Sequence, residues 1–94
     1  MAKMTEVPGN NKKHQVVLYA LSTCIWCKKT KELLDDLDVH YRYVFVDLLT
    51  GKEEQEIMDQ VREFNPGCTF PTMVIDNGKV IVGLNEPEIK KVLA

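Results

Sequence analysis

Apolar residues follow two alternating kinds of pattern along the first half of the chain. Residues 16–21 (VVLYAL) form an unbroken apolar run, which predicts a buried strand. From about residue 25 to 37, apolar side chains recur every three to five positions with charged residues between them, which predicts an amphipathic helix. Aromatic and β-branched residues dominate residues 41–46 and predict a second strand. Together these elements form a β-α-β unit, whose two strands are parallel if they share a sheet.

The second half of the chain predicts a helix, a hairpin and a final helix. Thr50-Gly51-Lys52-Glu53 has the form of a capping box, and the apolar stripe behind it ends at Asn65-Pro66-Gly67. Residues 72–75 and 79–82 are predicted strands, because the Asn-Gly of Asp76-Asn77-Gly78 suits a tight hairpin. A short helix is expected from near Glu86, with Pro87 in its first turn. The predicted order is therefore β-α-β-α-β-β-α.

The first residues differ in character from the rest. Residues 1–15 are polar and include the turn-forming Pro8-Gly9-Asn10-Asn11, so we expect residues 1–14 to be a flexible leader. Residues 15–94 are expected to form one domain, because 94 residues are too few for two cores. The polar start contains no apolar core of a signal peptide, and no stretch approaches the roughly 18 apolar residues of a membrane span. Neither secretion nor membrane insertion is expected.

Composition and charge narrow the classes of function. The 45% hydrophobic and 28% charged residues are ordinary globular values. The net charge of −2 is spread over interspersed acids and bases, which argues against a nucleic-acid partner. Three cysteines, two of them at C-x-x-C spacing, are too few for a secreted disulfide scaffold. We therefore expect a reducing compartment and a cytoplasmic location.

The Cys24-Ile25-Trp26-Cys27 motif carries the candidate chemistry, because it falls at the predicted turn from a strand into a helix. The unpaired amides and the positive dipole end of a helix N-terminus stabilise a thiolate. Cys24 is therefore the expected nucleophile, and Cys27, one turn further on, is the expected resolving thiol. The alternative is half of a metal knuckle or a pair of structural thiols. We expect no metal site, because the remaining candidate ligands, Cys68, His14 and His40, are widely separated.

Three segments of the chain resemble the glutaredoxin family: residues 21–27 (LSTCIWC), residues 69–71 (TFP) and residues 83–86 (GLNE). The resemblance covers about residues 15–94. It implies the thioredoxin fold in its short glutaredoxin form, an α/β domain with a four-stranded mixed sheet in strand order 2-1-3-4, flanked by three helices. It also implies a glutaredoxin-like protein-disulfide oxidoreductase, with no bound cofactor and with disulfide-containing proteins as substrates.

The resemblance further implies a substrate groove beside the thiols. In the family the proline of the second segment is cis, so the Phe70-Pro71 bond is expected to be cis, with Phe70 backbone atoms available to a substrate. Trp26 is expected to be an apolar platform for a partner chain, although packing at the helix start is an alternative. The implied substrate-binding residues are Trp26, Thr69, Phe70, Pro71, Gly83, Asn85 and Glu86.

Departures from the family pattern leave the electron donor open. Leu21 stands where glutaredoxins usually carry a lysine, Leu84 replaces a glycine, and Glu86 replaces an aspartate. Glutathione is therefore a possible reductant, and a dedicated reductase is an equally serious one. We expect a monomer, and we assign Cys68 no established role.

Two other functions remain alternatives. An iron-sulfur cluster carrier of the same fold is disfavoured because Trp26 is bulky and Cys27 adds a second thiol, where carriers of the family have small residues. A non-catalytic interaction domain of the same fold is the other alternative.

Overall fold

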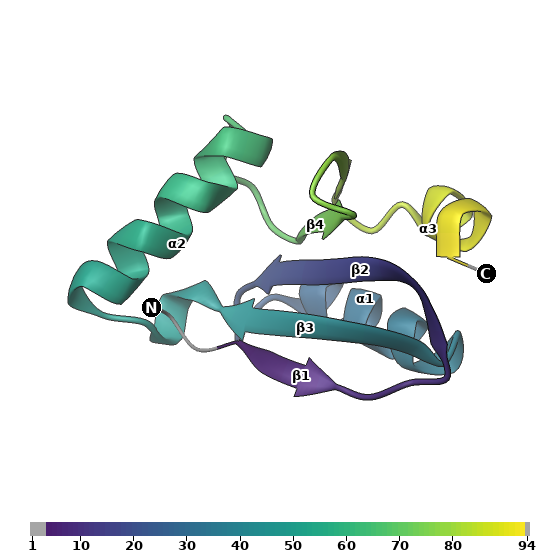
Figure 1. Cartoon of the computed structure of the whole chain (residues 1–94). Coiled ribbons are helices and arrows are strands. Elements are labelled where there is room, and N and C mark those ends of the chain that lie inside the picture. Colours follow the sequence, from purple (N-terminus) through teal and green to yellow (C-terminus); the bar gives the residue numbers. More distant parts are fainter. Residues whose placement is uncertain (1–3, 94) are drawn as a thin grey trace.

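The computed structural model describes residues 4–93 of the chain (Figure 1). Its elements, in chain order, are β1 (Thr5–Val7), β2 (Asn11–Ala20), α1 (Ile25–Asp36), β3 (Val39–Phe45), the short 3₁₀ helix η1 (Val46–Leu48), α2 (Gly51–Phe64), β4 (Thr72–Ile75), β5 (Lys79–Val82) and α3 (Glu86–Leu93). Each helix and strand that the hydrophobic pattern predicts is therefore present, and β1 is an addition.

The strands form one mixed sheet in the order β1-β3-β2-β4-β5. Strands β2 and β3 are parallel and are joined through α1, whereas the other pairs are antiparallel. Side chains alternate between the two faces of β2, as the period of a strand requires. Leu18 and Ala20 pack in a core with α1 and α3, while Tyr19 packs in a second core with α2. The sheet is thus covered on both faces, with α1 behind β2 and β3 in Figure 1.

The predicted four-strand order 2-1-3-4 is confirmed as the run β3-β2-β4-β5, but the sheet has a fifth strand. Strand β1 adds antiparallel to the free edge of β3, with Thr5 opposite Tyr43 and Val7 opposite Tyr41. The prediction that residues 1–14 are a flexible leader is therefore wrong from Thr5 onward, since β1 and the first residues of β2 belong to the sheet. Residues 1–3 lie outside the described residues.

Two local details differ from the sequence prediction. Thr50 lies at the N-cap of α2, but its side chain makes no capping hydrogen bond, so the capping box is not formed as expected. In the β4–β5 hairpin, the left-handed residues are Asp76 and Asn77, with φ of 53° and 60°, rather than Asn77 and Gly78. The Gly78 N–H donates to the Ile75 carbonyl at 3.1 Å and closes the turn. Asp and Asn tolerate this conformation, which a type I′ turn over residues 75–78 requires at both central positions.

Candidate active site

Cys24 occupies the N-cap position of α1, directly after the loop that leaves β2. Its backbone is extended, and its Sγ accepts a hydrogen bond from the Cys27 N–H at 3.2 Å. The thiol therefore takes the place that a Ser or Asp side chain often fills at a helix N-terminus. The sulfur therefore lies at the N-terminus of α1, at the positive end of the helix dipole.

The two thiols of the motif have different surroundings. Cys24 is half-buried, whereas the side chain of Cys27, in the first turn of α1, is completely buried in the core. Burial, followed by the hydrogen bond with Cys24, raises the pKa of Cys27 to about 12. Cys27 therefore remains a neutral thiol at neutral pH. Cys24 alone is accessible from solvent, so the geometry separates an exposed sulfur from a protected one.

The loop before β4 brings a second part of the predicted site into place. The Phe70-Pro71 bond is cis, as the resemblance implied. Phe70 and Cys24 both pack against the core that contains α1. The neighbouring residues are firmly held, because the Thr69 carbonyl accepts a 2.6 Å hydrogen bond from the Thr72 hydroxyl and the buried Pro71 accepts one from the Gly83 N–H at 2.8 Å. Among the described residues, no backbone hydrogen bond uses the N–H or C=O of Phe70.

The last predicted site segment is divided between the site and the final helix. Gly83, with φ of 76°, is tied to Pro71 through the hydrogen bond described above. Asn85 instead caps α3, since its carbonyl accepts from the Ile89 N–H at 3.0 Å. Glu86 forms an ion pair with Lys90, one turn further along the same helix, at 3.0 Å. The Asn85 N–H also donates to the Gly83 carbonyl at 3.0 Å, so Asn85 joins Gly83 to α3, whereas the ion pair of Glu86 lies within α3.

Asp47 is a site residue that the sequence analysis missed. It lies in η1, at the end of β3, and its two carboxylate oxygens accept from the Ser22 N–H at 2.8 Å and the Ser22 hydroxyl at 2.5 Å. These hydrogen bonds lower the pKa of Asp47. Its negative charge also makes a small contribution that raises the pKa of Cys27. Asp47 therefore anchors the loop that carries Cys24, and an acid that directly follows an apolar strand is the sequence signal for it.

Large apolar side chains are exposed around the motif. Ile25 and Trp26, between the two cysteines, are 63% and 55% exposed, and Leu48, next to Asp47, is 65% exposed. The Lys29 ammonium lies 5.0 Å from the centre of the Trp26 ring, within cation–π range. Trp26 is therefore not buried at the helix start, and its role as a platform for a partner chain stays a prediction. Leu48 was not predicted, because a single leucine in a polar stretch carries no pattern.

The remaining candidates lie apart from Cys24. Cys68 is a half-buried free thiol with φ of 51°, and it packs against the core of α2, on the other face of the sheet.

Within residues 4–93, no three His, Cys, Asp or Glu side chains are grouped so that they could hold a metal ion. Across the same residues, every helix is too short or too polar to span a membrane.

Comparisons with known proteins agree with this geometry. The model of the glutaredoxin family matches residues 16–81. A glutaredoxin-like 8.6 kDa protein from the rubredoxin operon of Clostridium pasteurianum, itself uncharacterized, is 35% identical over 78 residues, which cover 83% of this chain and 96% of that protein. The crystal structure of the glutaredoxin from Methanosarcina mazei Go1 is 50% identical, with a TM-score of 0.89, and the match covers 98% of this chain and 88% of that one.

Methanoredoxin from Methanosarcina acetivorans is also 50% identical, with a TM-score of 0.82 over 85% of this chain and 84% of the other. With 98% of this chain covered by the Methanosarcina mazei match, the fold is the thioredoxin-like glutaredoxin fold that the resemblance implied. The family match and the C-x-x-C motif coincide, because Cys24 and Cys27 lie inside the matched residues. The chain therefore belongs to the glutaredoxin family.

Proposed function

We propose that the protein is a dithiol–disulfide oxidoreductase in which Cys24 is the nucleophile and Cys27 the resolving thiol. The observation that carries this proposal is the asymmetry of the pair. Cys24 is accessible and its sulfur accepts an amide hydrogen bond, whereas Cys27 is buried with its pKa raised to about 12. A pair in which only one sulfur is exposed to a substrate attacks in a defined order.

The reaction proceeds in two exchanges. The Cys24 thiolate attacks one sulfur of a substrate disulfide, so that a Cys24–substrate disulfide forms and the other substrate sulfur leaves as a thiolate, which takes up a proton. Cys27 then attacks the Cys24 sulfur, and its proton passes to the substrate sulfur that departs. The Cys24–Cys27 disulfide forms, and the second substrate sulfur is released as a thiol. Two electrons have passed to the substrate, and an external thiol donor restores the reduced pair.

Protein disulfides are the substrates that the surroundings favour. Ile25 and Trp26, which directly follow Cys24, give a partner chain exposed apolar contacts near the attacking sulfur. The backbone of Phe70 can pair with an extended segment of that chain, as a strand pairs with a sheet edge. A monomer in the cytoplasm, as predicted from the sequence, is part of the same proposal.

We propose a reductase or a dithiol as the main electron donor, with glutathione as the alternative. Leu21, at the position of the family lysine, packs against the core of α2 and carries no charge for a glutathione carboxylate. Glu86 has Lys90 as a partner on its own helix. Both observations reduce the number of groups that are available to hold glutathione.

The test is the catalysed reduction of insulin disulfides with dithiothreitol as the electron donor, followed by turbidity and compared with dithiothreitol alone. Turnover is expected for the native chain and for Cys68→Ser, and its loss is expected for Cys24→Ser. A second assay supplies glutathione, glutathione reductase and NADPH in place of dithiothreitol. Fast NADPH consumption would establish glutathione as the donor. Insulin reduction that persists in Cys24→Ser would contradict the proposed function.

A further inference from the structure

A pocket of about 330 Å³ lies at the opposite end of β2 from the thiols, where the pairing of β2 with β3 is interrupted. Asn11 pairs with Val39 and the next pair is Val16 with Tyr41, so four residues of β2 lie between these pairs but only one residue of β3, His40. The extra residues make a bulge that separates the two strands. Figure 1 shows this region where β2 and β3 begin, away from their arrowheads.

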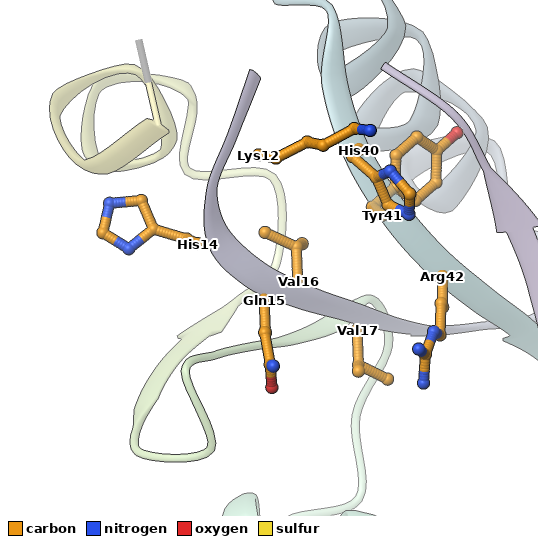
Figure 2. A pocket seen from close by; sticks show the side chains of 8 residues that line it. All are labelled: Lys12, His14, Gln15, Val16, Val17, His40, Tyr41 and Arg42. Carbon is orange, nitrogen blue, oxygen red and sulfur yellow. The ribbon is translucent and has the colours of Figure 1, made fainter. Parts of the chain in front are cut away.

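The ionisable side chains that line the pocket are all basic, except that of Tyr41. Figure 2 shows the lining side chains, which come from both strands: Lys12, His14, Gln15, Val16, Val17, His40, Tyr41 and Arg42. No carboxylate is among them. The whole chain has a net charge of −2, so this concentration of bases is a local feature of an acidic protein. A volume of this size lies at the lower end of the range for small-molecule sites.

The bases of the pocket keep hydrogen-bond donors free. Glu6, on β1, lies 3.6 Å from His40 Nε2 and 3.7 Å from Arg42 Nε, which is longer than the 2.7–2.9 Å of a charge-assisted hydrogen bond. The other ring nitrogen of His40, Nδ1, is buried without a hydrogen-bond partner. Within residues 4–93, Lys12 forms no ion pair.

His14 differs from the other three bases. Its Nδ1 lies 2.6 Å from the Asp76 carboxylate in the β4–β5 turn, which also accepts from the Gln15 N–H at 2.8 Å. This contact holds the bulged segment against the hairpin. His14 therefore shapes the pocket, and the donors available to a ligand are those of Lys12, His40 and Arg42.

We propose that this pocket binds a small, multiply charged oxyanion of the phosphate or pyrophosphate class. The planar guanidinium of Arg42 fits two oxygens of such a group, and the ammonium of Lys12 adds a point charge. His40 donates through Nε2, whose 3.6 Å separation from the Glu6 carboxylate is too long for a hydrogen bond. Val16 and Val17, which pack against opposite faces of the sheet, form the apolar part of the lining. None of the lining residues belongs to the redox site, so the inference does not depend on the proposed function.

The experiment is an amide NMR titration of the full-length protein with sodium pyrophosphate, at constant ionic strength maintained with chloride. Saturable shifts are expected at residues 12–17 and 40–42. Lys12→Gln and Arg42→Gln should each weaken binding by about tenfold, because each removes a charge-assisted hydrogen bond. Lys13→Gln is the matched control, since Lys13 is adjacent and exposed but does not line the pocket, and it should leave the affinity unchanged.

A second titration with adenosine diphosphate identifies the source of the oxyanion. Equal binding of both probes assigns the site to a free oxyanion, and tighter binding of the nucleotide assigns it to a nucleoside diphosphate. Linear, non-saturating shifts with pyrophosphate would overturn the inference. Equal weakening by Lys13→Gln and Lys12→Gln would also overturn it, because general surface charge would then explain the binding.

Discussion

The two ends of β2 differ in how their geometry arises. At the end that leads to Cys24, a buried strand, a short turn and an amphipathic helix follow one another within about twenty residues. At the other end, the bulge and its pocket depend on β3 and the β4–β5 turn, which are distant in sequence. The first region is therefore built by local interactions and the second by long-range pairing. Substitutions that separate the two regions test this difference.

The largest effect is expected at the thiol end. Cys24→Ser should reduce disulfide-exchange turnover on the order of a thousandfold or more, because the attacking sulfur is removed. Thermal unfolding should change little, since Cys24 is only half-buried. Turnover and melting temperature are measured on the same sample, with Cys68→Ser as the control that removes a thiol on the other face. A variant that keeps native turnover would exclude Cys24 as the nucleophile.

At the other end of β2, near the bulge, we expect a loss of stability when Gly9, which lies between β1 and β2, is replaced. A Cβ at this position would lie 2.6 Å from the Asp38 carbonyl oxygen and 2.6 Å from the Val39 carbonyl carbon, both of them backbone atoms. Gly9→Ala should therefore lower the free energy of unfolding by about 1–3 kcal/mol, because the start of β3 must shift. Denaturant titration measures this loss.

Gly67→Ala is the matched control for Gly9→Ala. The nearest atom to its added Cβ is a side-chain oxygen of Asn65 at 3.4 Å, so stability should be almost unchanged. Equal stability of both variants would show that β1 and β2 do not approach the start of β3 as closely as described.

A smaller and pH-dependent effect is expected for Asp47→Asn, which alters the anchor of the Cys24 loop. The Ser22 hydrogen bonds lower the pKa of Asp47 in the folded protein. Such a group stabilises the fold at pH values above its unfolded pKa of about 3.9, and this contribution is lost as the pH falls through the lower, folded value. The native protein should therefore be more stable than Asp47→Asn at pH 7, and the difference should disappear in strong acid. Urea midpoints across this range measure it, and a difference independent of pH would contradict the assignment.

The smallest effect is expected for Glu86→Gln, at the start of α3. Its ion pair with Lys90 is exposed and spans one helical turn, so its loss should cost no more than about 0.5 kcal/mol. Lys90→Gln removes the same pair from the other side and should reproduce this cost. Turnover should stay native with dithiothreitol and with glutathione. A loss in Glu86→Gln that is confined to glutathione would show that this carboxylate holds glutathione.

The sequence predicted the core of the fold and the position of the thiols because local signals agreed there. The apolar run of β2, the helical spacing of α1 and the hairpin between β4 and β5 each lie within a short window. Strand β1 was missed because it has three residues, two of them exposed, and pairs only with distant β3. Its sequence carries no alternation long enough to identify it.

The site was predictable only in part for the same reason. Cys24 and Pro71 could be identified from motifs, whereas the contact of Asp47 with Ser22 joins residues 25 positions apart. The capping box at Thr50 failed because a short motif does not determine side-chain geometry. The electron donor, the substrates and the iron-sulfur alternative stay predictions.

The central claim is that the fold makes Cys24 reactive and keeps Cys27 as a protected thiol. Brief alkylation of the reduced, folded protein with iodoacetamide at neutral pH tests it most directly, with fragment mass spectrometry to locate the label. The account predicts label on Cys24 and almost none on Cys27, and label on both once the protein is unfolded in denaturant. Equal labelling of Cys24 and Cys27 in the folded protein would contradict it.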